Sequence, residues 1–174
     1  KETSRKTIYG ISDLMFRFWY RYVFVNRTLI ETGAQQAVWL KRIEPDYDNY
    51  MGLVFEKVCM DYLSVKNARG ELPILFTRIG RWWGTNPATH VQEEIDLVAS
   101  DGKDYIFGEC KWRGEKIDLS VLRALKAKAD LFDRSRSNTY YFLFSKSGFT
   151  EAVINGAESD SRIMLVDLKE IMDF

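Results

Sequence analysis

The stretch EEIDLVASDGKDYIFGECKW, residues 93–112, decides the fold of this 174-residue chain. Its two halves alternate apolar and polar residues on either side of an Asp-Gly pair, which is the sequence pattern of a β-hairpin. Asp96 lies in the first half, and Glu109 and Lys111 lie in the second. These charges interrupt apolar strands, and a charge that is buried without a partner is costly. The hairpin therefore indicates a functional site as well as a sheet.

The register of this hairpin depends on the length of its loop. With a two-residue turn, Asp96 pairs with Phe107 and lies diagonal to Glu109. With a four-residue loop, Asp96 faces Glu109 directly. Either even-length loop places Asp96, Glu109 and Lys111 on one face of the sheet, whereas an odd-length loop separates them.

Two carboxylates on neighbouring strands, about 5–7 Å apart at the backbone, repel each other and raise one pKa unless a cation neutralises them. Mg²⁺ or Mn²⁺ can supply that charge, because hard cations prefer oxygen ligands such as Asp96, Glu109 and the main-chain carbonyl of Cys110. Lys111 would then assist an attacking water or stabilise charge that develops on a phosphate. This set predicts hydrolysis of a phosphodiester; the alternative is a group of solvated strand charges.

The remaining sequence predicts helices on both sides of the sheet strands. Residues 11–33 have helical periodicity with Ser12 as the cap, and a second short helix over 34–43 is expected to end before the turn-like EPDYDN. A helix that starts near Tyr50 carries Glu56 in its apolar face. The elements expected after it are a strand within 74–84, the hairpin, a helix over 117–132, a buried strand over 139–144, a short helix, a strand within 162–168 and a last helical turn.

This order predicts the fold class. A helix, three strands in a meander, a helix and a strand give an α-β-β-β-α-β core, an α/β fold with a mixed sheet flanked by helices. Residues 1–48 are expected to form a helical extension, and residues 49–174 are expected to form the main domain.

Charge is balanced in total but unevenly distributed. The chain has 25 basic and 25 acidic residues, so any attraction for nucleic acid must be local. Residues 91–110 contain six acids and one lysine, whereas residues 111–136 contain eight Lys or Arg and four acids. An acidic pocket beside a basic strip suits a phosphate backbone held against a metal; a solvated helix face is the alternative. The strip consists of Arg113, Lys116, Arg123, Lys126 and Lys128.

The cysteines, the histidine, the apolar stretches and the nucleotide-binding motifs of the sequence argue against several classes of protein. Cys59 and Cys110 have no CxxC partner and His90 is the single histidine, which argues against structural zinc and a disulfide framework. We expect reduced, buried thiols in a cytoplasmic protein. The longest apolar stretch is interrupted by arginines, so no membrane span is expected. A P-loop motif is missing too, which argues against ATP binding through such a loop.

Several segments together carry a resemblance to a known family. Asp96 followed by Glu109-x-Lys111, after a helix that carries Glu56, resembles the PD-(D/E)XK nuclease superfamily, whose fold is restriction-endonuclease-like. More narrowly, nearly the whole chain resembles the domain of unknown function found C-terminal to archaeal and bacterial AAA+-type ATPases. The segments that carry this resemblance are FRFWYRYVF (16–24), GLVFE (52–56), GRWWG (80–84), EIDLVA (94–99) and GECKW (108–112).

The resemblance implies that Glu56, Asp96, Glu109 and Lys111 are the nuclease-like set, with Glu56 as a further metal ligand. Ile95 departs from the proline that often precedes the acid in that superfamily. The resemblance also implies DNA as the substrate, and an ATPase module and a winged helix before residue 1. Taken alone, Glu56 reads as a salt-bridge partner or an edge residue. The competing interpretation of the whole chain is a non-catalytic nucleic-acid-binding or regulatory module of the ATPase.

Overall fold

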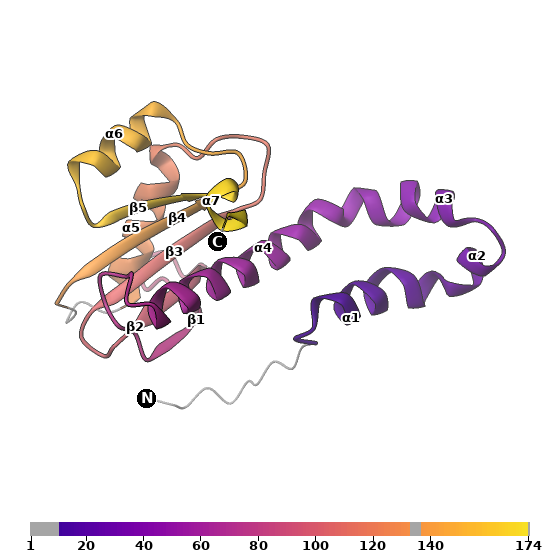
Figure 1. The fold of residues 1–174 in the computed structure, drawn as a ribbon, viewed down its shortest axis with the longest axis horizontal. Helices are drawn as coiled ribbons and strands as arrows, with labels where there is room; N and C mark the ends of the chain where they lie inside the picture. Colours follow the sequence, from indigo (N-terminus) through magenta and orange to yellow (C-terminus); the bar gives the residue numbers. More distant parts are fainter. Residues whose placement is uncertain (1–10, 133–136, 174) are drawn as a thin grey trace. The chain divides into compact units, whose positions relative to one another are not determined.

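The computed structural model describes residues 11–132 and 137–173. The chain divides into two compact units, Lys1–Tyr50 and Met51–Phe174. The described part of the first unit is helical, and the second unit contains a sheet with helices (Figure 1). Within the described ranges, no helix combines the length and the apolar character that a bilayer span requires.

The first unit is a helical hairpin that turns at Gly33, whose φ of 90° is readily adopted only by glycine. Asp13, rather than the expected Ser12, caps the first helix, because its carboxylate accepts a hydrogen bond from the Phe16 N–H at 2.9 Å. The segments in order are α1 (Leu14–Phe18), a π-helical turn (Trp19–Val23), a 3₁₀ turn (Phe24–Asn26), α2 (Arg27–Glu31), α3 (Gln35–Val38) and a second π-helical turn (Trp39–Ile43).

The predicted break before EPDYDN is wrong. Helix α4 (Glu44–Ala68) follows the π-helical turn Trp39–Ile43 directly and runs for 25 residues. Pro45 has no N–H to donate, so it normally ends or kinks a helix. Here Pro45 is the second residue of α4, in its first turn, where proline is tolerated, and the π-helical turn just before it interrupts the regular hydrogen-bond ladder. The chain therefore passes through a turn-like sequence without leaving the helix.

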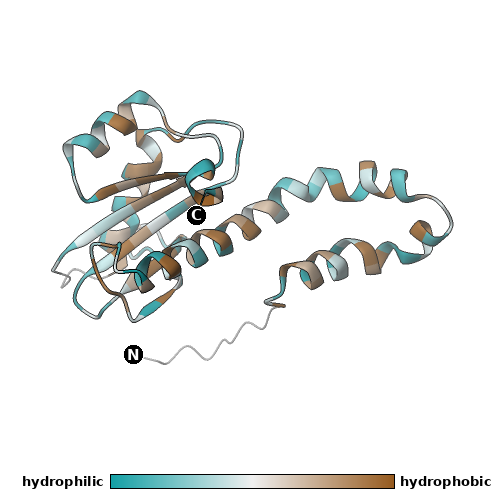
Figure 2. Cartoon of the chain, in the orientation of Figure 1, coloured by the Kyte–Doolittle hydropathy of each residue, from teal (hydrophilic) through white to brown (hydrophobic). Residues whose placement is uncertain are grey.

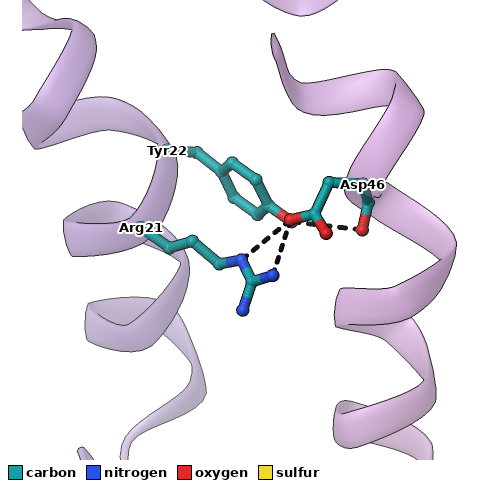
Figure 3. Close-up of polar contacts among 3 residues, drawn as sticks. All are labelled: Arg21, Tyr22 and Asp46. Atoms are coloured by element: carbon teal, nitrogen blue, oxygen red, sulfur yellow. Dashed lines mark hydrogen bonds and ion pairs between the residues drawn. The ribbon is translucent and has the colours of Figure 1, made fainter.

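Aromatic rings and one polar cluster hold the first unit together. The buried Tyr22 and Tyr50 rings meet edge to face at 5.5 Å, and the Tyr50 hydroxyl donates to the Leu14 carbonyl at 2.8 Å. Asp46 accepts hydrogen bonds from the Tyr22 hydroxyl and from the Arg21 guanidinium, both at 2.7 Å (Figure 3). Burial, together with the hydrogen bond to Asp46, raises the pKa of Tyr22 to about 12.

The second unit is built on a five-stranded mixed sheet with strand order β1-β2-β3-β4-β5. The first three strands are antiparallel neighbours, and β4 and β5 join in parallel. This arrangement confirms the predicted α-β-β-β-α-β order and the mixed sheet flanked by helices (Figure 1). The elements after α4 are β1 (Arg78–Thr85), β2 (Gln92–Ser100), β3 (Tyr105–Lys111), α5 (Leu119–Phe132), β4 (Thr139–Ser145), α6 (Glu151–Ser159), β5 (Ile163–Asp167) and α7 (Leu168–Met172).

Helices cover both faces of the sheet and enclose two apolar cores. Phe142 and Phe144 of β4 pack into the core beneath α4, whereas Leu143 packs into the core beneath α5 and α6. This alternation, with both faces buried, is what a parallel strand between two helical layers requires. The strand predicted over 139–144 is therefore an inner strand of the sheet, and only part of it has the brown colour of hydrophobic residues in Figure 2.

Candidate functional site

The hairpin loop has four residues. Ser100 pairs with Tyr105 and Leu97 pairs with Gly108, so the loop runs over residues 101–104. Asp101 closes it, because its carboxylate accepts hydrogen bonds from the main-chain N–H groups two and three residues later, at 2.8 and 2.9 Å. The two-residue turn is thus excluded. The observed register, continued toward the site, brings Asp96 opposite Glu109.

A β-bulge lies where β2 carries its acid. Gly80 pairs with Val98 but Trp82 pairs with Ile95, so Arg81 faces the two residues between them, Asp96 and Leu97. Ile95 consequently packs into the core beneath α5, and Leu97 packs into the core beneath α4. Strict two-residue alternation would place Ile95 and Leu97 on one face of the sheet, and the bulge separates them. The extra residue also changes the direction of Asp96 relative to a regular strand.

The two strand carboxylates lie together in the interior. Asp96 is 7% exposed and Glu109 is 6% exposed. The main-chain N–H of Cys110 donates to Oδ2 of Asp96 at 2.9 Å. Burial raises the pKa of Asp96, and repulsion by Glu109 raises it further, while Lys111 and Lys128 act in the opposite direction. Both effects make the ionised form of Asp96 costly in the folded protein.

Two lysines share the Glu109 carboxylate. Lys111 Nζ lies 2.6 Å from Oε1, and Lys128 Nζ lies 3.3 Å from Oε2. Lys128 comes from α5, where the buried Leu125 and Ala129 fix the helix against the sheet. The structure thus brings the predicted Asp96, Glu109 and Lys111 together and adds Lys128 to them. Lys128 was predicted to belong to the basic strip. Its position beside Ala129 on an amphipathic helix is the signal that it approaches the sheet.

Glu56 has a different partner. It forms an ion pair with Arg81, the residue of β1 that faces the bulge. Among residues 11–132 and 137–173, no three His, Cys, Asp or Glu side chains are arranged so that they could hold a metal ion. Asp96 and Glu109 therefore form a pair of carboxylates, and the role of Glu56 as a third ligand stays a prediction. Arg81 was not anticipated, since nothing in GRWWG distinguishes it from a surface arginine.

The cysteines lie in the core next to this pair. Cys59 of α4 and Cys110 of β3 are both buried and free, as expected. Burial raises the pKa of the Cys110 thiol, and contact with Cys59 raises it further. The main-chain carbonyl of Cys110 stays an expected ligand rather than an observed one.

The basic strip consists of two kinds of residue. Arg113, Lys116 and Arg123 are exposed to solvent. Lys126 pairs with Asp160 at 3.7 Å and lies over the Tyr141 ring, 5.2 Å from its centroid. Three of the five residues are thus free to meet a phosphate backbone, and the binding of DNA to them stays a prediction.

Comparison with known proteins gives a family. A family model described as archaeal and bacterial proteins of unknown function, DUF234, matches residues 19–127. An uncharacterized protein of Methanocaldococcus jannaschii is 38% identical over 135 residues, which are 76% of this chain and 28% of that protein. The chain thus spans less than a third of that relative's length. No solved structure matches. Because the family model covers more than half of the chain, the protein belongs to the DUF234 family.

Proposed function

We propose that the second unit hydrolyses phosphodiester bonds in DNA with the help of a divalent cation, Mg²⁺ or Mn²⁺. The observation that carries the proposal is the pair of buried carboxylates, Asp96 and Glu109, with the Lys111 ammonium 2.6 Å from one of them. Perturbed carboxylates that lie beside a lysine are common at functional sites. The superfamily resemblance points to the same residues.

The donor set fits a magnesium-type cation. Asp96 and Glu109 supply hard oxygen atoms, and a cation between them would offset the repulsion that raises the pKa of Asp96. Mg²⁺ usually keeps several waters and is held by one or two carboxylates together with substrate phosphates. A pair of carboxylates without a third is therefore sufficient, whereas calcium, with six to eight oxygen ligands, would need more donors.

The protein's own groups have distinct roles in this proposal. Asp96 is oriented by the Cys110 N–H, and Glu109 is oriented by its two lysines. The Lys111 side chain is 29% exposed, so its ammonium can reach a phosphate that approaches from solvent and stabilise the negative charge that develops there. When bound, the cation would supply Lewis-acid polarisation of a phosphate oxygen. Exposed Arg113, Lys116 and Arg123 would hold the DNA backbone.

The test is a cleavage assay with matched variants. The full chain is incubated with supercoiled, linear or branched DNA and Mg²⁺ or Mn²⁺, alongside Asp96→Asn and Lys111→Met. Glu94→Gln is the control for the acid, because Glu94 lies in the same strand but is exposed. Lys103→Met, at an exposed position of the hairpin loop, is the control for the lysine. We expect cleavage by the wild type and Glu94→Gln, and its loss in both site variants. Cleavage that survives in Asp96→Asn contradicts the proposal.

A second candidate function is a non-catalytic module that binds an attached AAA+-type ATPase. It is favoured by the exposed apolar side chains of the first unit, where Trp19, Tyr20 and Phe24 contact one another at the surface. Figure 2 shows apolar residues along these helices. This function predicts that no DNA is cleaved under any condition, and that binding to the ATPase module is equal in wild type and Asp96→Asn but weaker in Tyr20→Ala.

A further inference from the structure

We infer that Lys128 competes with the divalent cation for Glu109 and so sets the affinity of the site for metal. The inference rests on the proposed function, since it concerns the same pair of carboxylates. Lys128 is a positioning residue here: it acts through Glu109, which it holds in place when the site contains no metal.

The charge balance of the cluster gives the first reason. Asp96 and Glu109 contribute two acids, and Lys111 and Lys128 contribute two ammonium groups, so the cluster is neutral when all four are ionised. A divalent cation would leave it with two uncompensated positive charges beside carboxylates that are 7% and 6% exposed. Buried excess charge is costly, so entry of the metal favours departure of a lysine.

The hydrogen bonds give the second reason. Lys111 contacts Oε1 of Glu109 and Lys128 contacts Oε2, so both oxygens of this carboxylate already have a cationic partner. A metal held by Glu109 would use an oxygen that an ammonium group already contacts, and at Oε2 that ammonium belongs to Lys128. The two cations therefore compete for one oxygen atom.

Lys128 is the lysine that leaves more easily. Its contact is 3.3 Å long, against 2.6 Å for Lys111. Lys111 is two residues from Glu109 on the same strand, whereas Lys128 reaches across from α5 and has a 20% exposed side chain. Its flexible stem can carry the ammonium to solvent without movement of the helix. Metal entry thus exchanges one cation for another.

The first test is isothermal titration of the full chain with Mn²⁺. We expect Lys128→Gln to bind Mn²⁺ about two- to fivefold more tightly than wild type, the scale of one partly exposed ion pair. Lys128→Arg keeps the competing charge and should bind like wild type. Lys126→Gln, on the same helix but paired with Asp160, should also leave the affinity unchanged.

The second test uses the wild type alone. Amine acetylation of Lys128, followed by mass spectrometry, should become faster when Mn²⁺ is added, while that of Lys126 should not change. If wild type binds Mn²⁺ but Lys128→Gln binds equally or less tightly, or Lys128 labelling does not rise, the inference fails and the proposed function stands. If wild type binds no Mn²⁺, both fail.

Discussion

Two isosteric substitutions that each remove one charge from the carboxylate pair should change the free energy of unfolding in opposite directions. Glu109→Gln should lower it, and Asp96→Asn should raise it. Glu109→Gln leaves the Lys111 and Lys128 ammonium groups without their anion, at 2.6 and 3.3 Å. Loss of a partner from a fully buried ion pair costs about 3–5 kcal/mol. Here the lysine side chains are 29% and 20% exposed and can regain some water, so we expect a loss of about 2 kcal/mol in the free energy of unfolding.

Asp96→Asn should raise stability in metal-free buffer. The amide oxygen can still accept the Cys110 N–H, while the burial cost of the charge and the repulsion by Glu109 disappear. Because the pKa of Asp96 is raised on folding, the native state binds more protons, and stability falls as pH rises from the ordinary Asp range through the raised pKa. The Asn variant should lack this decline.

Urea unfolding in EDTA measures both variants. The fluorescence of Trp82, Trp83 and Trp112 reports on the second unit, with Glu94→Gln as the exposed control. The reasoning is refuted if Glu109→Gln and Asp96→Asn shift the midpoint in the same direction by similar amounts, because the two acids would then have equivalent surroundings.

Three further predictions concern the framework of the protein. Gly108→Ala should cost about 1–2 kcal/mol in denaturant unfolding, because the new Cβ would lie 3.1 Å from the Leu97 Cβ in the facing strand; no loss would mean that the strands separate freely there. Leu143→Ala, at a fully buried central position, should cost about 2–5 kcal/mol, and a smaller loss would show that the core refills the cavity. In alkaline difference spectra, Tyr22→Phe should lose a phenol that ionises at about pH 12, whereas loss of one that ionises near pH 10 would contradict the buried contact with Asp46.

Much of the second unit could be predicted from its sequence because each element has a clear period. Two-residue alternation marks β2 and β3, continuous apolar residues mark β4, and the spacing of Leu122, Leu125 and Ala129 marks α5. The convergence of Asp96, Glu109 and Lys111 followed from the even loop length. These are local signals, and the sheet preserves them except at the bulge in β2.

Other features depend on contacts that no local pattern contains. The bulge at Asp96 is fixed by pairing with β1, so alternation alone placed Ile95 and Leu97 on the same side. The pairing of Lys128 with Glu109 requires the packing of α5, and the pairing of Glu56 with Arg81 requires two segments that are separated in the chain. Helix α4 continues through Pro45, although proline locally favours the end of a helix, because tertiary context can override propensity.

Because β2 has one extra residue at its bulge, the meeting of Asp96 and Glu109 depends on the exact number of residues in the strand as well as on their chemistry. Deleting Leu97 would restore strict two-residue periodicity, with Asp96 alone opposite Arg81 and Ile95 still paired with Trp82. Ile95 would then stay in the core beneath α5, but Asp96 would shift one position along β3, from opposite Glu109 to opposite Gly108, although both acids would still be present in the sequence. A homologue that keeps every motif letter but lacks this one-residue offset should therefore be expected to have lost the site.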